Sequence, residues 1–132
     1  MKAFILGLVF TICFAGYTVA AVPQKGETIT VKVNREKRES HSKITVRFVE
    51  MVEDSRCPTD VQCIQAGNAK IKVRVSRNGR SRMMELNTGR PNEPSIFEGY
   101  ELKLTALTPE PRSNIRINRN GYLATIAIHK AY

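Results

Sequence analysis

The sequence has no tryptophan, only two histidines and only three cysteines among its 132 residues. A serine triad needs a histidine base, and a cysteine nucleophile needs a thiolate beside a base. His41 lies in a polar turn and His129 near the end of the chain, and the sequence places no serine beside either. A glycine-rich phosphate loop is also missing, because Gly79 and Gly121 follow asparagines as turn residues. We therefore predict that the protein is not an enzyme and uses no cofactor.

Two groups of potential metal ligands are too weak to predict a metal site. The spacing of the acidic residues around residues 50–60 matches no calcium loop. Met83 and Met84 are neighbours, so on a strand they point to opposite faces and do not form a copper site together. The acidic residues of the first group are Glu50, Glu53, Asp54 and Asp60.

Long apolar runs are absent except at the N-terminus, where Lys2 precedes the apolar residues 3–16. This run is shorter than the roughly 20 residues of a membrane-spanning helix. Small residues at positions 18 and 20 then complete the pattern of a secretory signal peptide. We predict a cleaved signal peptide at residues 1–20 and a single mature domain at residues 21–132, which is periplasmic or extracellular and does not span a membrane.

Cleavage leaves two cysteines, Cys57 and Cys63, in an oxidising compartment where a disulfide is expected. The loop between them is short, so the chain-entropy account gives the bond about 2 kcal/mol of stabilisation. We therefore expect the bond chiefly to hold the shape of the loop. The full chain carries 21 basic and 12 acidic residues, and removing Lys2 lowers its net charge from +9 to +8.

The mature chain alternates apolar and polar residues with the period of a β-strand in six segments. Asn78-Gly79 is typical of a type I′ turn, which predicts a hairpin over residues 69–87 with Val73 in its buried face. A phase slip after Phe48 predicts a β-bulge, and residues 35–42 form a charged turn. The segments are residues 28–34, 44–48, 70–76, 82–86, 100–106 and 122–129.

These short strands predict an all-β protein, a two-layer antiparallel β-sandwich that is immunoglobulin-like in general shape. A small β-barrel is the alternative. The last strand carries no strongly charged side chain on either face up to His129, which predicts a central position in a sheet. Pro109 and Pro111 end the strand before it.

Three short motifs resemble a pattern in an uncharacterised family of small exported bacterial β-domain proteins. They are Asp54-Ser55-Arg56-Cys57-Pro58, Val61-x-Cys63 and Ala66-Gly67-Asn68-Ala69, with weaker similarity in residues 99–102, 107–111 and 122–125. The sequence departs from the pattern at Gln65, where the family has an aromatic residue. The resemblance implies an exported β-domain and no particular activity.

The loop at residues 53–67 is the first candidate contact surface, because loops on rigid scaffolds carry function more often than strands do. Its charged residues Asp54, Arg56 and Asp60 are the candidate contact residues. The structural alternative is that Asp54 caps a turn or pairs with Arg56, and that the loop is a clasp between the two sheets.

Lys70, Lys72 and Arg74 share one strand face and form the second candidate, an anion-binding surface. The lack of tryptophan argues against nucleic acid as a partner. An anionic envelope component or a protein is favoured instead. We expect an exported, non-catalytic binding or envelope-associated protein, with a secreted protease inhibitor acting through the loop at residues 53–67 as the alternative.

Overall fold

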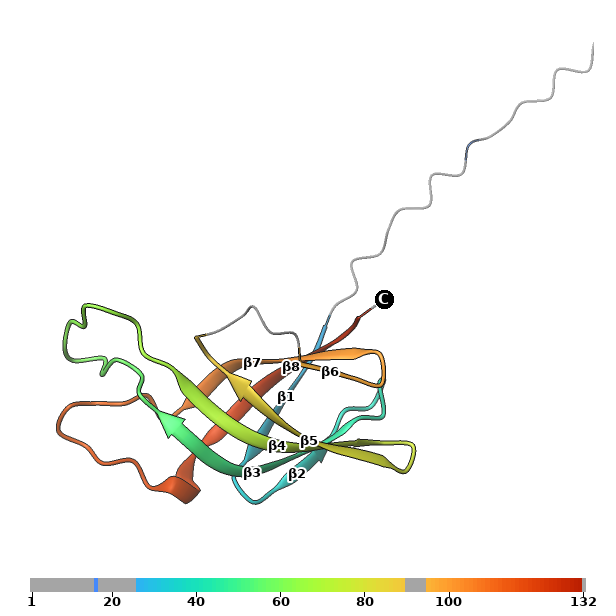
Figure 1. Cartoon of the computed structure of the whole chain (residues 1–132), viewed down its shortest axis with the longest axis horizontal. Coiled ribbons are helices and arrows are strands. Elements are labelled where there is room, and N and C mark those ends of the chain that lie inside the picture. The colour runs from blue at the N-terminus through green and yellow to red at the C-terminus, as the bar shows by residue number, and fades with distance from the viewer. Residues whose placement is uncertain (1–15, 17–25, 90–94, 132) are drawn as a thin grey trace, which may run out of the picture.

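The computed structural model describes residue 16, residues 26–89 and residues 95–131. Within them, eight strands form two antiparallel sheets of four strands each, which pack face to face (Figure 1). The first sheet has the order β1 (Glu27–Lys32), β8 (Leu123–Lys130), β7 (Tyr100–Thr108) and β6 (Ser95–Phe97). The second has the order β2 (Glu36–Arg38), β3 (Thr45–Asp54), β4 (Ala69–Arg77) and β5 (Arg80–Asn87). A short 3₁₀ turn, η1 (Arg119–Gly121), precedes β8.

The predicted two-layer sandwich is therefore confirmed, and the two sheets do not close into the alternative barrel. β8 lies between β1 and β7, in the central position that the sequence predicts. Apart from Gly16, the predicted signal peptide lies outside the described residues. Within the described residues, no helix has the length and apolar character needed to cross a membrane.

The core forms because every second residue of each long strand faces the opposite sheet. On β4 the inward residues Ile71, Val73 and Val75 are completely buried, and Phe48 of β3 and Ile126 of β8 meet them in the same core. Each of these side chains contributes about 1.5 to 3 kcal/mol by leaving water. The burial of Val73 follows the sequence prediction.

The hairpin of β4 and β5 turns at Asn78 and Gly79, as the sequence predicts. Both residues have positive φ angles, 50° and 76°, which a type I′ turn requires at its two central positions. Arg77 and Arg80 are the last pair of the ladder before this turn.

β3 is longer than the sequence pattern predicts, because it continues through two irregularities. One register shift lies between Phe48 and Glu50, at the predicted bulge, and a second lies between Met51 and Glu53. The strand thereby reaches Asp54, at the end of the sandwich. The predicted charged turn at residues 35–42 is wrong in part, since Glu36–Arg38 pairs with β3 as the edge strand β2.

Candidate functional site

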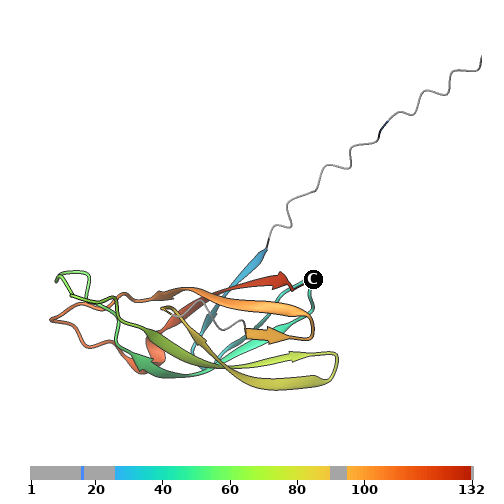
Figure 2. The ribbon, with the colours of Figure 1, turned by 45° about the horizontal axis from the view of Figure 1, so that its top comes forward.

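Two long loops from different sheets meet at one end of the sandwich. Residues 55–68 join β3 to β4 in the second sheet, and residues 109–122 join β7 to β8 in the first. We call these two segments together the loop end. Figures 1 and 2 show them side by side, opposite the end that holds the C-terminus. The amide of Thr59 donates to the Pro111 carbonyl at 2.9 Å, and the amide of Ser113 donates to Oδ1 of Asp60 at 2.9 Å. The Ser113 hydroxyl also donates to Oδ2 of Asp60, so the loops hold each other directly.

Two cross-links, a disulfide and a backbone hydrogen bond, close the loop at residues 55–68. Cys57 and Cys63 form the predicted disulfide, with their Cα atoms 6.0 Å apart. Below it, the Ser55 amide donates to the Asn68 carbonyl at 2.8 Å. Gly67 is required there, because a Cβ atom at that position would lie 1.6 Å from the Ser55 carbonyl oxygen. The loop is therefore a closed structure of defined shape.

Arg56 connects this loop to the opposite sheet. Its Nε and Nη2 donate to the two carboxylate oxygens of Asp54 at 2.8 and 2.9 Å, in the paired geometry that suits a guanidinium. Its Nη1 donates to the carbonyl of Leu107 at 2.6 Å, and Nη2 also donates to that of Pro109 at 2.9 Å. One side chain thus joins the end of β3 to the end of β7.

This arrangement corrects the expectation that the loop exposes Arg56 with its acids. The side chains of Arg56 and Asp54 are each only 14% exposed, because each binds the other and the carbonyls beyond it. Asp60 is exposed, but its carboxylate is occupied by Ser113. The structure therefore supports the alternative reading in which Asp54 pairs with Arg56 and the loop is a clasp.

Tyr122 completes the network, since its hydroxyl donates to Oδ2 of Asp54 at 2.9 Å. Burial acts to raise the pKa of Asp54, but the hydrogen bonds from Arg56 and Tyr122 outweigh it, and the pKa lies below its usual value. Burial and the bond to Asp54 raise the pKa of Tyr122 to about 12. Near neutral pH the carboxylate stays ionised and the phenol neutral, so the cluster is suited to holding structure and not to proton transfer.

Asp54 and Arg56 are turned inward, and the loop end presents aliphatic side chains to solvent among exposed charged residues such as Arg112 and Arg116. Ile64 is fully exposed beside the disulfide, at 104% of its reference area. Val61 is 46% exposed on the same loop, and Ile115 is 58% exposed on the loop that binds it. The sequence analysis missed these residues, and their signal was the apolar pair that flanks Cys63 within an otherwise polar loop.

The second candidate surface, the outer face of β4, is partly neutralised by neighbouring acids. Lys72 donates to Glu50 of β3 at 2.8 Å, and Lys70 lies 3.7 Å from Glu85 of β5. The bond to Glu50 raises the pKa of Lys72. Arg74 is exposed and has no carboxylate within salt-bridge distance among the described residues. The face therefore offers less free positive charge than the sequence predicts.

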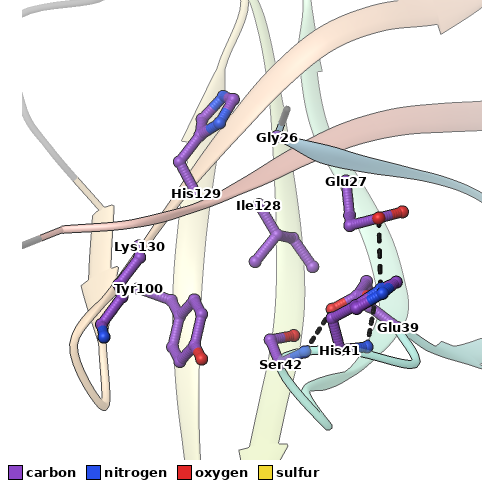
Figure 3. Close-up of a pocket in the computed structure, with 9 residues that line it drawn as sticks. All are labelled: Gly26, Glu27, Glu39, His41, Ser42, Tyr100, Ile128, His129 and Lys130. Atoms are coloured by element: carbon purple, nitrogen blue, oxygen red, sulfur yellow. Dashed lines mark hydrogen bonds and ion pairs between the residues drawn. The ribbon is translucent and has the colours of Figure 1, made fainter. Parts of the chain in front are cut away.

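A different cluster, which the sequence analysis did not bring together, lies at the opposite end. Glu27, Glu39 and His41 line a pocket of about 340 Å³ (Figure 3). Glu39 is only 3% exposed. Burial acts to raise its pKa, but hydrogen bonds from Ser42 and His41 prevail and lower the pKa to about 2. Near neutral pH its carboxylate is therefore a negative charge inside the fold.

The fold and these contacts define an antiparallel β-sandwich with a disulfide-closed loop that is anchored by a largely buried arginine side chain. No protein-family model matches the chain, and no curated protein or solved structure matches it.

Proposed function

We propose that this is an exported, non-catalytic binding protein that contacts a protein partner through the loop end. The observation that carries the proposal is Ile64, a branched apolar side chain that is fully exposed on a closed loop. A single exposed aliphatic residue is ordinary. Here, however, Val61 and Ile115 are exposed at the same end, on two loops that are hydrogen-bonded to each other.

The rigidity of the two loops favours binding, because their conformation is already fixed before a partner binds. The disulfide, the Arg56 contacts and the Asp60–Ser113 contacts restrict both loops. Association then loses less conformational entropy than it would with flexible loops. Aliphatic side chains on such a frame suit a complementary apolar pocket in another protein.

The composition of the loop end favours a protein over the other surfaces considered. The one aromatic residue in residues 55–68 and 109–122 is Tyr122, which is buried at 5% exposure. Single-stranded nucleic acids are held on aromatic side chains, and proteins anchor at membrane interfaces chiefly by tryptophan and tyrosine. An apolar contact by valine and isoleucine requires neither.

Site-specific photocrosslinking tests the proposal. A photoreactive amino acid replaces Ile64 in the mature protein, which is incubated with an envelope extract of the source organism. The control carries the same group at Ile96, which is 45% exposed on β6, away from the loop end. We expect a discrete adduct at position 64 that unlabelled wild-type protein competes away and Ile64→Asp does not. The same adduct at position 96, or no adduct at position 64, contradicts the proposal.

A protease inhibitor is the second candidate, because a closed loop with an outward side chain resembles a substrate held ready for a protease. Arg56 is not available as the residue that enters a protease, since its guanidinium binds Asp54 and two carbonyls. The exposed Ile64 instead favours proteases that prefer aliphatic residues. A panel assay should show inhibition of an aliphatic-specific serine protease and none of trypsin, and Ile64→Asp should abolish it. Absence of inhibition across the panel excludes this candidate and leaves the first intact.

A further inference from the structure

We propose that Glu27, Glu39 and His41 form a binding site for a divalent metal ion of the zinc class. Glu27 is the first residue of β1 in the first sheet, whereas Glu39 and His41 lie in the turn between β2 and β3 in the second. The three side chains converge from the two sheets at the mouth of the pocket, as Figure 3 shows. The site is independent of the loop end, which is at the other end of the sandwich.

The spacing of the donor atoms fits tetrahedral coordination of a metal ion. Nδ1 of His41 lies 3.1 Å from Oε1 of Glu27 and 3.4 Å from Oε1 of Glu39. All three ligand atoms lie within 4.8 Å of one another. Zinc bound at about 2.0 to 2.1 Å places neighbouring tetrahedral ligands about 3.3 Å apart. Small rotations of the two exposed side chains, Glu27 and His41, are enough to centre an ion among them.

The charge around the cluster is the second, independent observation. The protein carries a net charge of +9, yet no lysine or arginine among the described residues forms an ion pair with Glu27 or Glu39. Lys130 lines the same pocket, but Figure 3 draws no ion pair from its ammonium to either carboxylate. Arg77 is also near, but its Nε donates to the Ser42 carbonyl and its guanidinium lies 5.1 Å from the Tyr100 ring centre. Two carboxylates thus face one imidazole, which is a deficit of positive charge that a divalent cation would fill.

Glu39 is held in place by groups that leave it able to bind a metal. The amide of His41 donates to Oε1 at 2.7 Å, and the amide of Ser42 donates to Oε2 at 2.6 Å. A carboxylate has about four lone-pair directions. The Ser40 hydroxyl donates to Oε1 at 3.4 Å, a long contact that a metal ion would displace. Metal-binding carboxylates are commonly oriented by such second hydrogen bonds.

The donor set selects the class of ion. Calcium prefers six to eight oxygen ligands, whereas one imidazole nitrogen with two carboxylate oxygens suits zinc. Three protein ligands leave the fourth tetrahedral position open, and the adjoining pocket of about 340 Å³ can hold water there. The bound ion would also connect β1 to the β2–β3 turn, and so join the two sheets at the end that has no disulfide.

The two histidines of the chain provide a matched pair for the test. His129 also lines the pocket, but its ring packs against Gly26 and points away from the cluster (Figure 3). Isothermal titration with zinc chloride is run on the mature chain without a histidine tag, in wild type, His41→Ala, Glu27→Gln and His129→Ala. We expect one saturable site in wild type, binding at least about tenfold weaker in the first two variants, and unchanged binding in His129→Ala.

Thermal unfolding supplies a readout that surface adsorption of zinc would not give. Zinc that binds only the folded state should raise the melting temperature of wild type and His129→Ala, but not of His41→Ala, and EDTA should reverse the rise. The mutated side chains are 77% and 45% exposed, so both variants are expected to fold. No saturable site in wild type, or equal loss in His129→Ala, overturns the proposal.

Discussion

Each end of the sandwich holds a carboxylate that is largely shielded from solvent, but the two carboxylates receive their hydrogen bonds from different kinds of group. At the loop end, Asp54 is held by two side chains, that of Arg56, which is two residues further along the chain, and that of Tyr122, which comes from the other sheet. At the opposite end, which we call the turn end, Glu39 is held by amides of its own turn, those of His41 and Ser42. Through the Tyr122 hydroxyl and the carbonyls that Arg56 also binds, the Asp54 cluster joins parts of the fold that are far apart in the chain. A carboxylate satisfied by its own turn shapes that turn and stays available to a further cation.

The difference extends to what each end presents to solvent. At the loop end, Asp54 and Arg56 are used in internal contacts, and exposed aliphatic residues lie among exposed charged residues such as Arg112 and Arg116. The turn end keeps Glu27 and His41 exposed beside a pocket. This contrast assigns apolar contact to the first end and cation binding to the second, and the predictions below test it.

The largest effect is expected from removing the arginine of the loop end. Arg56→Ala leaves Asp54 without its cation and leaves two carbonyls without their donor, which should lower the free energy of unfolding by about 3 kcal/mol. Urea unfolding at neutral pH measures it. Arg74→Ala, on the exposed face of β4, is the matched control and should change the unfolding midpoint very little. An Arg56 effect no larger than that of Arg74 would show that the clasp does not stabilise the fold.

Removal of the disulfide should have the next largest effect. The double substitution Cys57→Ser and Cys63→Ser opens a short loop, which should cost about 2 kcal/mol by the chain-entropy account. Reductant should lower the stability of wild type by a similar amount and leave the double variant unchanged. Because the hydrogen bonds of Asp60 and Arg56 remain, the variant should still fold; a variant without β circular dichroism contradicts this view of the loop.

At the turn end, Glu39→Gln should cost about 1 to 2 kcal/mol near neutral pH, measured in EDTA. The substitution keeps the shape but replaces charge-assisted hydrogen bonds by neutral ones and gives one backbone amide a poor partner.

The same variant should change the response to acid. The pKa of Glu39 is about 2 in the fold against an ordinary 4.5, so its stabilisation is complete above about pH 4.5 and is lost as pH falls to about 2. Wild type should therefore lose stability faster than Glu39→Gln across this window, although Asp54 titrates in both. Parallel curves for the two proteins contradict the assigned role of Glu39.

The smallest effect is expected between the two ends, on the outer face of β4. Replacing Lys70, Lys72 and Arg74 together by alanine should leave partner crosslinking at position 64 unchanged, because the two lysines pair with acids of the neighbouring strands. A loss of the adduct that also follows rising salt concentration would instead assign the contact to this face.

Local patterns in the sequence predicted a large part of this fold. Alternation placed Val73 in the core, Asn78-Gly79 placed the hairpin turn, and the phase slip after Phe48 placed a bulge. Each depends on residues that are close in the chain. The edge strand β2 escaped prediction because its three residues are all charged, and pairing with β3 decided its conformation.

The candidate sites were less predictable, for a reason that Arg56 illustrates. Its pairing with Asp54, two residues earlier, was open to inference from the sequence. Its bonds to the carbonyls of Leu107 and Pro109 were not, because they cross more than fifty residues. Those bonds decide that the guanidinium lies inside, and therefore that Ile64 and not Arg56 is the outward residue.

The sequence by itself determined the strand period, the hairpin turn and the disulfide between Cys57 and Cys63, which are the two cysteines that follow the predicted signal peptide. Only the tertiary structure decided which charged side chains are paired inside the fold and which stay available to a ligand or partner. Packing two sheets face to face brings Asp54 to Tyr122 and Glu27 to His41, and a charged group becomes structural or available according to the partners it meets there. Side chains of different sheets have no common period in the sequence, so their meeting is a property of the fold alone.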